Sequence, residues 1–204
     1  MKARYLLFVA VLLFGLVGVS YQVTHALFSD TAQSAANTFT AAAEFPTPQP
    51  GKIIINEAVN SATDSEEWVE LYNSGGSPVD VTGWKVADAD SDDTFPSVSP
   101  IPAGGFAVVV PSTSTLVIPA SAIKIQLSNG TVGSGLNASG DKLVLSDSSN
   151  NEIDKMSYAS NHDAFTGLGV NGSGQSMARS PNGVDTDTVG DWVSNATPTP
   201  GLTN

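Results

Sequence analysis

Short apolar stretches separated by turn residues run through most of this chain. Between residues 52 and 110, residues 53–55 form a β-branched run, residues 66–73 form a second strand that ends in an Asn-Ser-Gly-Gly turn, and residues 106–110 form another apolar run. Between the last two of these, a further strand is predicted from residue 79 through a glycine to residue 86. Each stretch is bounded by Gly, Pro, Asn or Asp, which is typical of an antiparallel sandwich or barrel. No helix of useful length fits between them.

The pattern continues in the second half. Residues 123–126 alternate apolar and polar positions and predict a half-exposed strand. Residues 142–145 and 152–158 predict a hairpin around the polar turn at 148–151. Two shorter strands are expected near residues 175–179 and 191–193, after a long Gly/Ser/Asn loop earlier in this half. The whole predicts an all-β domain.

The second strand has apolar residues on both faces. Trp68, Glu70 and Tyr72 share one face, and residues 69 and 71 share the other. We therefore expect a central strand, with Trp68 and Trp84 as anchors of the core.

The first 51 residues differ in character from the rest. A positive start at Lys2 and Arg4 precedes an uncharged apolar run at 5–19, and Thr-His-Ala at 24–26 supplies small residues for signal peptidase. We expect residues 1–26 to be an export signal cleaved after Ala26. The alternative is an uncleaved helical anchor, because extending the run to residue 23 brings it close to the roughly 20 residues of a membrane span.

Residues 27–51 predict an arm followed by a spacer. Pro46, Pro48 and Pro50 alternate with polar residues, which favours an extended, semi-rigid linker. We place the domain boundary there, so that residues 52–204 form the folded domain.

Several segments of this domain together resemble the lamin tail domain. They are Ile-Asn-Glu at 55–57, Glu-Trp-Val-Glu-Leu-Tyr-Asn at 67–73, Val-Thr-Gly-Trp at 81–84, Pro-Ala-Gly-Gly at 102–105, and Arg179, Trp192 and the closing Thr-Pro-Gly-Leu-Thr-Asn at 199–204. The resemblance covers residues 52–204 and implies an immunoglobulin-like β-sandwich of the exported prokaryotic type, with a binding or structural role. The positions that carry the motif are Asn56, Glu57, Trp68, Glu70, Leu71, Asn73, Gly83, Trp84, Gly104, Arg179 and Trp192.

The start of the arm resembles another family. Leu-Phe-Ser-Asp-Thr-Ala at 27–32, followed by Asn-Thr-Phe-Thr-Ala at 37–41, is similar to the mature start of camelysin-like biofilm-fibre subunits. This resemblance implies an export route. One hypothesis is that residues 27–44 add as a strand to a neighbour's sheet, which would build a self-assembling fibre. The alternative is a flexible stalk.

Glu57 and Glu70 are the carboxylates that a hydrolase mechanism would use. In the family pattern both recur beside the aromatic core, so we expect them to accept hydrogen bonds from loop backbone. A paired-carboxylate hydrolase would need an open cleft with the carboxylates about 5 to 9.5 Å apart. No nucleophile elbow, HExxH motif or phosphate loop is present in the sequence. We therefore predict no catalytic residues and no enzymatic activity, with a secreted hydrolase as the alternative.

Two acidic clusters are candidate calcium sites. Asp88, Asp90 and Asp92 alternate in one loop, and Asp185 and Asp187 form a second pair. Calcium takes oxygen ligands of this kind, although the first cluster does not match the EF-hand spacing. The alternative for the first cluster is a solvated hairpin loop without an ion.

Four Asn-x-Ser/Thr sequons are candidate sites for N-linked glycans, at Asn129, Asn137, Asn171 and Asn195.

Charge narrows the expected partners. Against 8 Lys and Arg the chain has 20 Asp and Glu, a net charge of −12, which disfavours direct binding to nucleic acid. There is no cysteine, so disulfides and thiolate metal sites are excluded. We expect an extracellular or cell-surface protein that binds a cell-envelope or matrix protein, a polysaccharide or another copy of itself. It would contact a membrane only through residues 5–23, if they are not cleaved.

Overall fold

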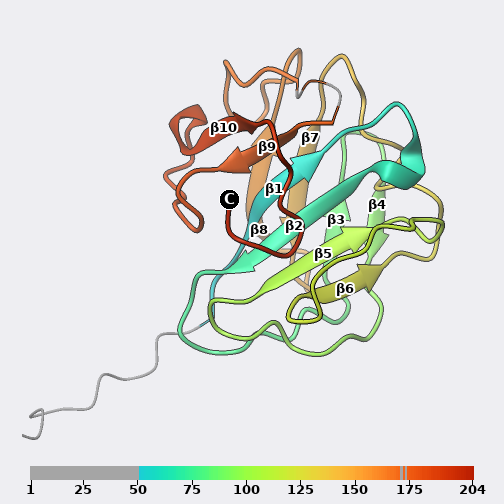
Figure 1. Cartoon of the computed structure of the whole chain (residues 1–204), viewed down its shortest axis with the longest axis vertical. Helices are drawn as coiled ribbons and strands as arrows, with labels where there is room; N and C mark the ends of the chain where they lie inside the picture. Colours follow the sequence, from blue (N-terminus) through green and yellow to red (C-terminus); the bar gives the residue numbers. More distant parts are fainter. Residues whose placement is uncertain (1–50, 171, 173) are drawn as a thin grey trace, which may run out of the picture. The chain divides into compact units, whose positions relative to one another are not determined.

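The computed structural model describes residues 51–170, 172 and 174–204 (Figure 1). The predicted signal or anchor at 1–26 and the arm at 27–44 lie outside the described residues, as does the linker up to residue 50. The cleavage and strand-addition hypotheses therefore stay predictions. Within the described part of the chain, no helix is long and apolar enough to cross a membrane.

Two sheets make up the domain, and the all-β prediction is confirmed. The larger sheet has six strands in the order β10-β9-β1-β2-β5-β6. Its strands, in chain order, are β1 (Ile53–Val59), β2 (Trp68–Asn73), β5 (Phe106–Val110), β6 (Ile123–Gln126), β9 (Ser176–Arg179) and β10 (Trp192–Asn195). Neighbours are antiparallel, except that β6 runs parallel to β5.

The smaller sheet has four antiparallel strands in the order β4-β3-β7-β8. They are β3 (Lys85–Ala87), β4 (Asp92–Thr94), β7 (Lys142–Ser146) and β8 (Glu152–Ser157). The described helical elements are two three-residue 3-10 turns, η1 (Asp64–Glu66) and η2 (Val189–Asp191). The hairpin expected around residues 148–151 is the β7–β8 hairpin.

The core between the sheets follows the predicted alternation. Val69 and Leu71 of β2 are fully buried in the same cluster as Leu143 and Leu145 of β7. Since β2 lies between β1 and β5, its prediction as a central strand is also confirmed. Burial of such side chains contributes on the order of 1.5–3 kcal/mol each, and with no disulfide in the sequence this packing has to hold the two sheets together.

The expected tryptophan anchors are placed differently from the prediction. Trp68 is buried on the outer face of the larger sheet, in a separate cluster with Val59, Val108 and Val110. Trp84 is only half-buried and packs against the edge of the core. The strand predicted over 79–86 shortens to β3, because Val79 instead forms an isolated bridge with Ile101. Alternation shows which residues share a face, but it does not show which face meets the other sheet.

Two motif glycines have backbone conformations that explain them. Gly83 has a φ of +76° and Gly104 a φ of +68°. Both values fall in the left-handed region, where a residue with a Cβ is strained. These positions fix turns in the sandwich.

Arg179 joins the two sheets. It lies on β9 with 1% of its side chain exposed, and its Nη2 contacts both carboxylate oxygens of Asp154 on β8 at 3.1 Å. Its Nε donates to the Ile55 carbonyl at 2.7 Å, and Asp154 accepts from the Ile55 amide, also at 2.7 Å. β9 pairs with β1 only at Glu57 and Ala58. Beyond the end of this pairing, the backbone groups of Ile55 on β1 bond to the side chains of Arg179 and Asp154 instead of to a strand.

Loss of this bridge should destabilise the fold. We expect Arg179→Met to lower the free energy of unfolding by about 3–5 kcal/mol, because it leaves the buried Asp154 without a cation. Urea denaturation at neutral pH measures the change. Lys155→Met is the matched control, since its ion pair with Glu152 is solvent-exposed and should contribute less than about 1 kcal/mol. Equal losses in the two variants would contradict this role for Arg179.

Candidate functional site: buried carboxylates and a polar groove

Glu57 and Glu70 lie beneath the C-terminal segment 196–204, which crosses the outer face of the larger sheet (Figure 1). They are directly opposite each other on β1 and β2, and both are fully buried. Glu57 accepts from the Thr199 amide at 3.1 Å and from the Ser176 hydroxyl. Glu70 accepts from the Gly201 amide at 2.6 Å. Glu57 and Glu70 therefore accept hydrogen bonds from loop backbone, as expected.

Two motif asparagines make further buried hydrogen bonds. The Asn56 side chain donates to Glu70 at 2.8 Å and accepts from the Gly183 amide at 3.3 Å. Asn73 is also buried, and its amide group donates to the carbonyls of Ser77 at 2.8 Å and Ile101 at 3.0 Å. These polar side chains replace missing strand partners, as buried backbone groups require.

The acidic loop before β4 separates into buried and exposed carboxylates. Asp88 is 4% exposed and accepts from the amides of Asp90, Ser91 and Ser134. Burial alone would raise the pKa of Asp88, but these hydrogen bonds together lower it. Asp90 is exposed.

The first two residues of β4 also differ, one being buried and one exposed. Asp93 is buried and accepts from the Gly133 amide and the Asn129 side chain, at 2.7 Å each. Asp92 is exposed and pairs with Lys85 at 3.0 Å. The segment is the β3–β4 hairpin, as predicted, but Asp88 is buried instead of solvated, and the neighbouring Asp93 is buried as well. They anchor the glycine-rich loop 129–141, and the structure does not bring Asp88, Asp90 and Asp92 together around a common point.

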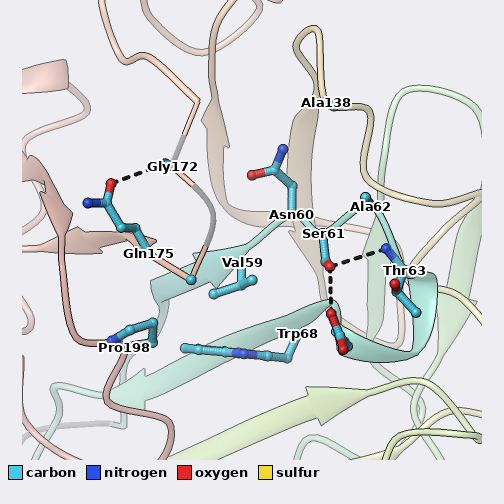
Figure 2. Close-up of a pocket in the computed structure, with 12 residues that line it drawn as sticks. Val59, Asn60, Ser61, Ala62, Thr63, Trp68, Ala138, Gly172, Gln175 and Pro198 are labelled. Carbon is cyan, nitrogen blue, oxygen red and sulfur yellow. Dashed lines mark hydrogen bonds between the residues drawn. The ribbon is translucent and has the colours of Figure 1, made fainter.

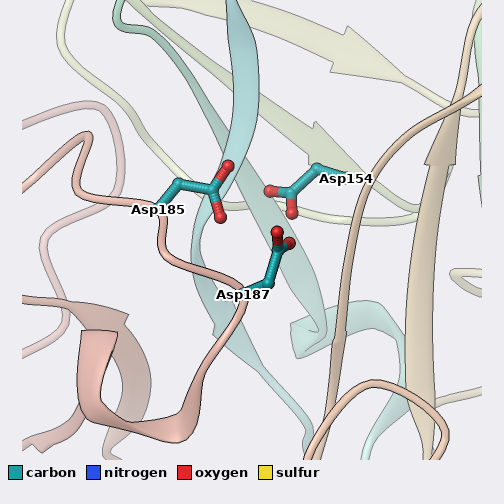
Figure 3. A group of neighbouring side chains, drawn as sticks. All are labelled: Asp154, Asp185 and Asp187. Carbon is teal, nitrogen blue, oxygen red and sulfur yellow. The ribbon is translucent and has the colours of Figure 1, made fainter.

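Asp185 and Asp187 do converge, and the third member of their group is Asp154 (Figure 3). One carboxylate oxygen from each lies within 4.8 Å of the others. Arg179 already contacts two of the three, since its Nη2 is 3.1 Å from Asp154 and 3.2 Å from Asp185. Lys52 pairs with Asp185 at 3.1 Å, and Asp187 is exposed. A calcium ion would share these carboxylates with the two cations.

Arg179 has a third acidic partner. Its Nη1 contacts Asp191 at 3.2 Å, and its guanidinium lies 4.7 Å from the ring centroid of Trp192. Burial opposes the charge on Asp191, but hydrogen bonds from Thr186 and Thr188 and the charge of Arg179 lower its pKa. Arg179 is therefore paired with a carboxylate directly before the closing strand β10.

Sequence reasoning missed Asp154, Glu67 and Asp141. Asp154 has the same parity as the buried Met156 on β8, which is a signal for an inward-facing acid. Glu67 accepts from the Leu136 amide at 2.9 Å and Asp141 from the Ala89 amide at 3.1 Å, and both are buried. Those two contacts join segments 52 to 69 residues apart, which no local pattern reveals.

A groove of about 500 Å³ opens beside Trp68. Figure 2 shows residues 59–63 on one side, with Gln175 and Pro198 on the other and the Trp68 ring at the bottom. Its lining offers the polar side chains of Asn60, Ser61, Thr63, Glu66 and Gln175. The volume lies within the range of ordinary ligand sites. No sequence motif had indicated it, because the groove forms between loops distant in the chain.

Comparison with models of known protein families matches residues 46–160 to the Lamin Tail Domain. The matched segment is more than half of the 204 residues and ends before β9. Arg179 and Trp192 lie beyond it. No curated protein matches the sequence.

Stability should fall as the pH rises from about 5 to 8. Burial raises the pKa of Glu67 and of Glu70 to about 8 and that of Asp154 to about 6, although hydrogen bonds and Arg179 oppose the shifts. In this window the folded protein keeps protons that the unfolded chain has lost, so each group lowers the free energy of unfolding by up to about 1.4 kcal/mol per pH unit.

Urea denaturation at several pH values tests this expectation. Glu67→Gln, which cannot ionise, should reduce the slope between pH 5 and 8. A free energy of unfolding that increases steadily over this window would contradict the assignment of raised pKa values.

The calcium hypothesis also makes a measurable prediction. On this hypothesis, a calcium concentration 100 times the Kd stabilises the native protein by about 2.7 kcal/mol and raises its Tm, since a ligand that binds only the folded state adds to its stability. Asp187→Asn should remove this increase, whereas Asp90→Asn, an exposed residue of the other acidic loop, should retain it. A Tm that responds to neither calcium nor chelator would exclude the site.

Proposed function

Because the chain belongs to the lamin tail domain family, whose immunoglobulin-like fold is typically a non-enzymatic module, we propose that it is an exported, non-catalytic component of the cell envelope or extracellular matrix. It would act by binding a partner on a rigid sandwich. Residues 1–26, as a signal peptide or an anchor, would take it out of the cytoplasm.

The proposal that the protein is non-catalytic rests on the burial and hydrogen bonding of its candidate catalytic carboxylates. Glu57 and Glu70, the candidates for a hydrolase, are fully buried, covered by the segment 196–204, and already bonded to its amides. A general acid or nucleophile must reach the substrate in an open site. Their arrangement favours a structural role over the alternative of a secreted hydrolase.

The groove beside Trp68 is the proposed binding face. It is lined by amide, hydroxyl and carboxylate side chains beside the largely buried Trp68 ring, and these polar groups suit the hydroxyl groups of a sugar. The net charge of −12 disfavours anionic polymers. We therefore place a neutral polysaccharide first among the partners, ahead of an envelope protein or a second copy of the chain.

Filling the groove tests this function. Ala62 lines the groove and is exposed, so Ala62→Trp should block it without altering the core. We expect cosedimentation of the full chain with isolated cell walls and insoluble neutral glucans to weaken at least tenfold, which is about 1.4 kcal/mol.

Ser99→Trp provides the control, since Ser99 is exposed and does not line the groove. Equal binding by the two variants would rule out the groove as the binding face. A protein that sediments with neither material, while a pull-down retains an envelope protein or the chain itself, would move the proposal to those partners.

A further inference from the structure

The structure distinguishes among the sequons, which sequence alone treats as equal. Asn129, Asn137 and Asn195 lie in the described part of the chain, and Asn171 lies outside it. N-linked modification requires the side-chain amide nitrogen, Nδ2, to reach a bulky saccharide donor. The hydrogen bonds and exposure of each Nδ2 therefore decide between them.

Asn137 has an exposed side chain with an open amide nitrogen. Its Oδ1 accepts from the amide of Ser139 at 2.8 Å and from the hydroxyl of the same residue at 2.7 Å. Its Nδ2 makes no hydrogen bond to a described residue. The sequon thus folds on itself, so that the hydroxyl polarises the amide and the nitrogen faces solvent.

The backbone of Asn137 is held firmly beneath this side chain. Its amide donates to Asp141 at 3.0 Å, and its carbonyl accepts from the buried Tyr158 hydroxyl at 2.9 Å and from the Gly140 amide at 3.1 Å. Because these contacts involve only main-chain groups of Asn137, a glycan on Nδ2 would break none of them.

The other two described sequons use Nδ2 inside the fold. Asn129 donates it to the buried Asp93 at 2.7 Å, and Asn195 donates it to the buried Glu57 at 3.3 Å. A saccharide at either position would have to sit beside a buried carboxylate that anchors a loop.

We propose that Asn137 carries an N-linked glycan. In the transfer, Nδ2 attacks the anomeric carbon of a lipid-linked oligosaccharide and forms a C–N bond. The C–O bond to the lipid phosphate or pyrophosphate breaks, that group leaves with the electron pair, and the amide releases one proton. The inference rests on the proposed export, because the transfer takes place beyond the cytoplasm. Ala138 of the same loop lines the groove, so the glycan would stand at its rim (Figure 2).

Peptide mapping by mass spectrometry of the full chain, purified from its own host with its location recorded, tests the proposal. We expect saccharide mass on the peptide that contains Asn137. It should be lost completely in Asn137→Gln and in Ser139→Ala, which keeps the asparagine. Asn129→Gln and Asn195→Gln should retain it.

An unmodified Asn137, or a glycan on Asn129 or Asn195 in its place, would overturn the inference. The location separates the two proposals. An unmodified chain found outside the cytoplasm overturns the glycan alone, whereas an unmodified chain retained in the cytoplasm overturns the proposed function as well.

Discussion

The structure depends on one buried cation. Arg179 is the only basic residue that is fully buried among the described residues, and it contacts Asp154, Asp185 and Asp191, the Ile55 carbonyl and the Trp192 ring. These partners come from both sheets, from the loop before η2 and from η2 itself. Removing charges from water is costly, so such a centre persists only where each group has a partner. The contacts of Arg179 thereby hold the end of β9, the loop before η2 and the closing strand β10 in place.

The same need for a partner explains where many of the acidic residues lie. Of the 20 acidic residues, the structure buries Glu57, Glu67, Glu70, Asp88, Asp93, Asp141, Asp154 and Asp191. Apart from Asp191, each accepts at least one hydrogen bond from a residue 40 or more positions away, and so anchors loops in a protein that has no disulfide. The proposed recognition is then left to the surface, where the groove beside Trp68 and the turn at Asn137 lie next to each other through Ala138.

Local patterns predicted much of this fold. Most of the strands, the β7–β8 hairpin, the central place of β2 and the acceptor role of Glu57 and Glu70 followed from alternation and from the family resemblance, whereas β4 lies where an acidic loop was expected. Features set by distant pairing could not be predicted. The larger sheet buries both of its faces, so Trp68 could not be assigned to the outer cluster from parity. Asp88 resembled a solvated acid, because a distant amide that it binds in the fold comes from residue 134. The groove needs three separate segments and has no signal in any one of them.

The most direct test of the central claim, that the buried carboxylates are closed structural acceptors, is NMR of the native protein. Carbon-detected titration of Glu57 and Glu70 would be combined with hydrogen exchange at the amides of Thr199 and Gly201. The account predicts carboxyl pKa values above the ordinary value for glutamate and strongly protected amides, because the segment 196–204 covers both groups. Carboxyls that titrate as exposed glutamates, with amides that exchange freely, would contradict it and would reopen the outer face of the sheet as a reactive site.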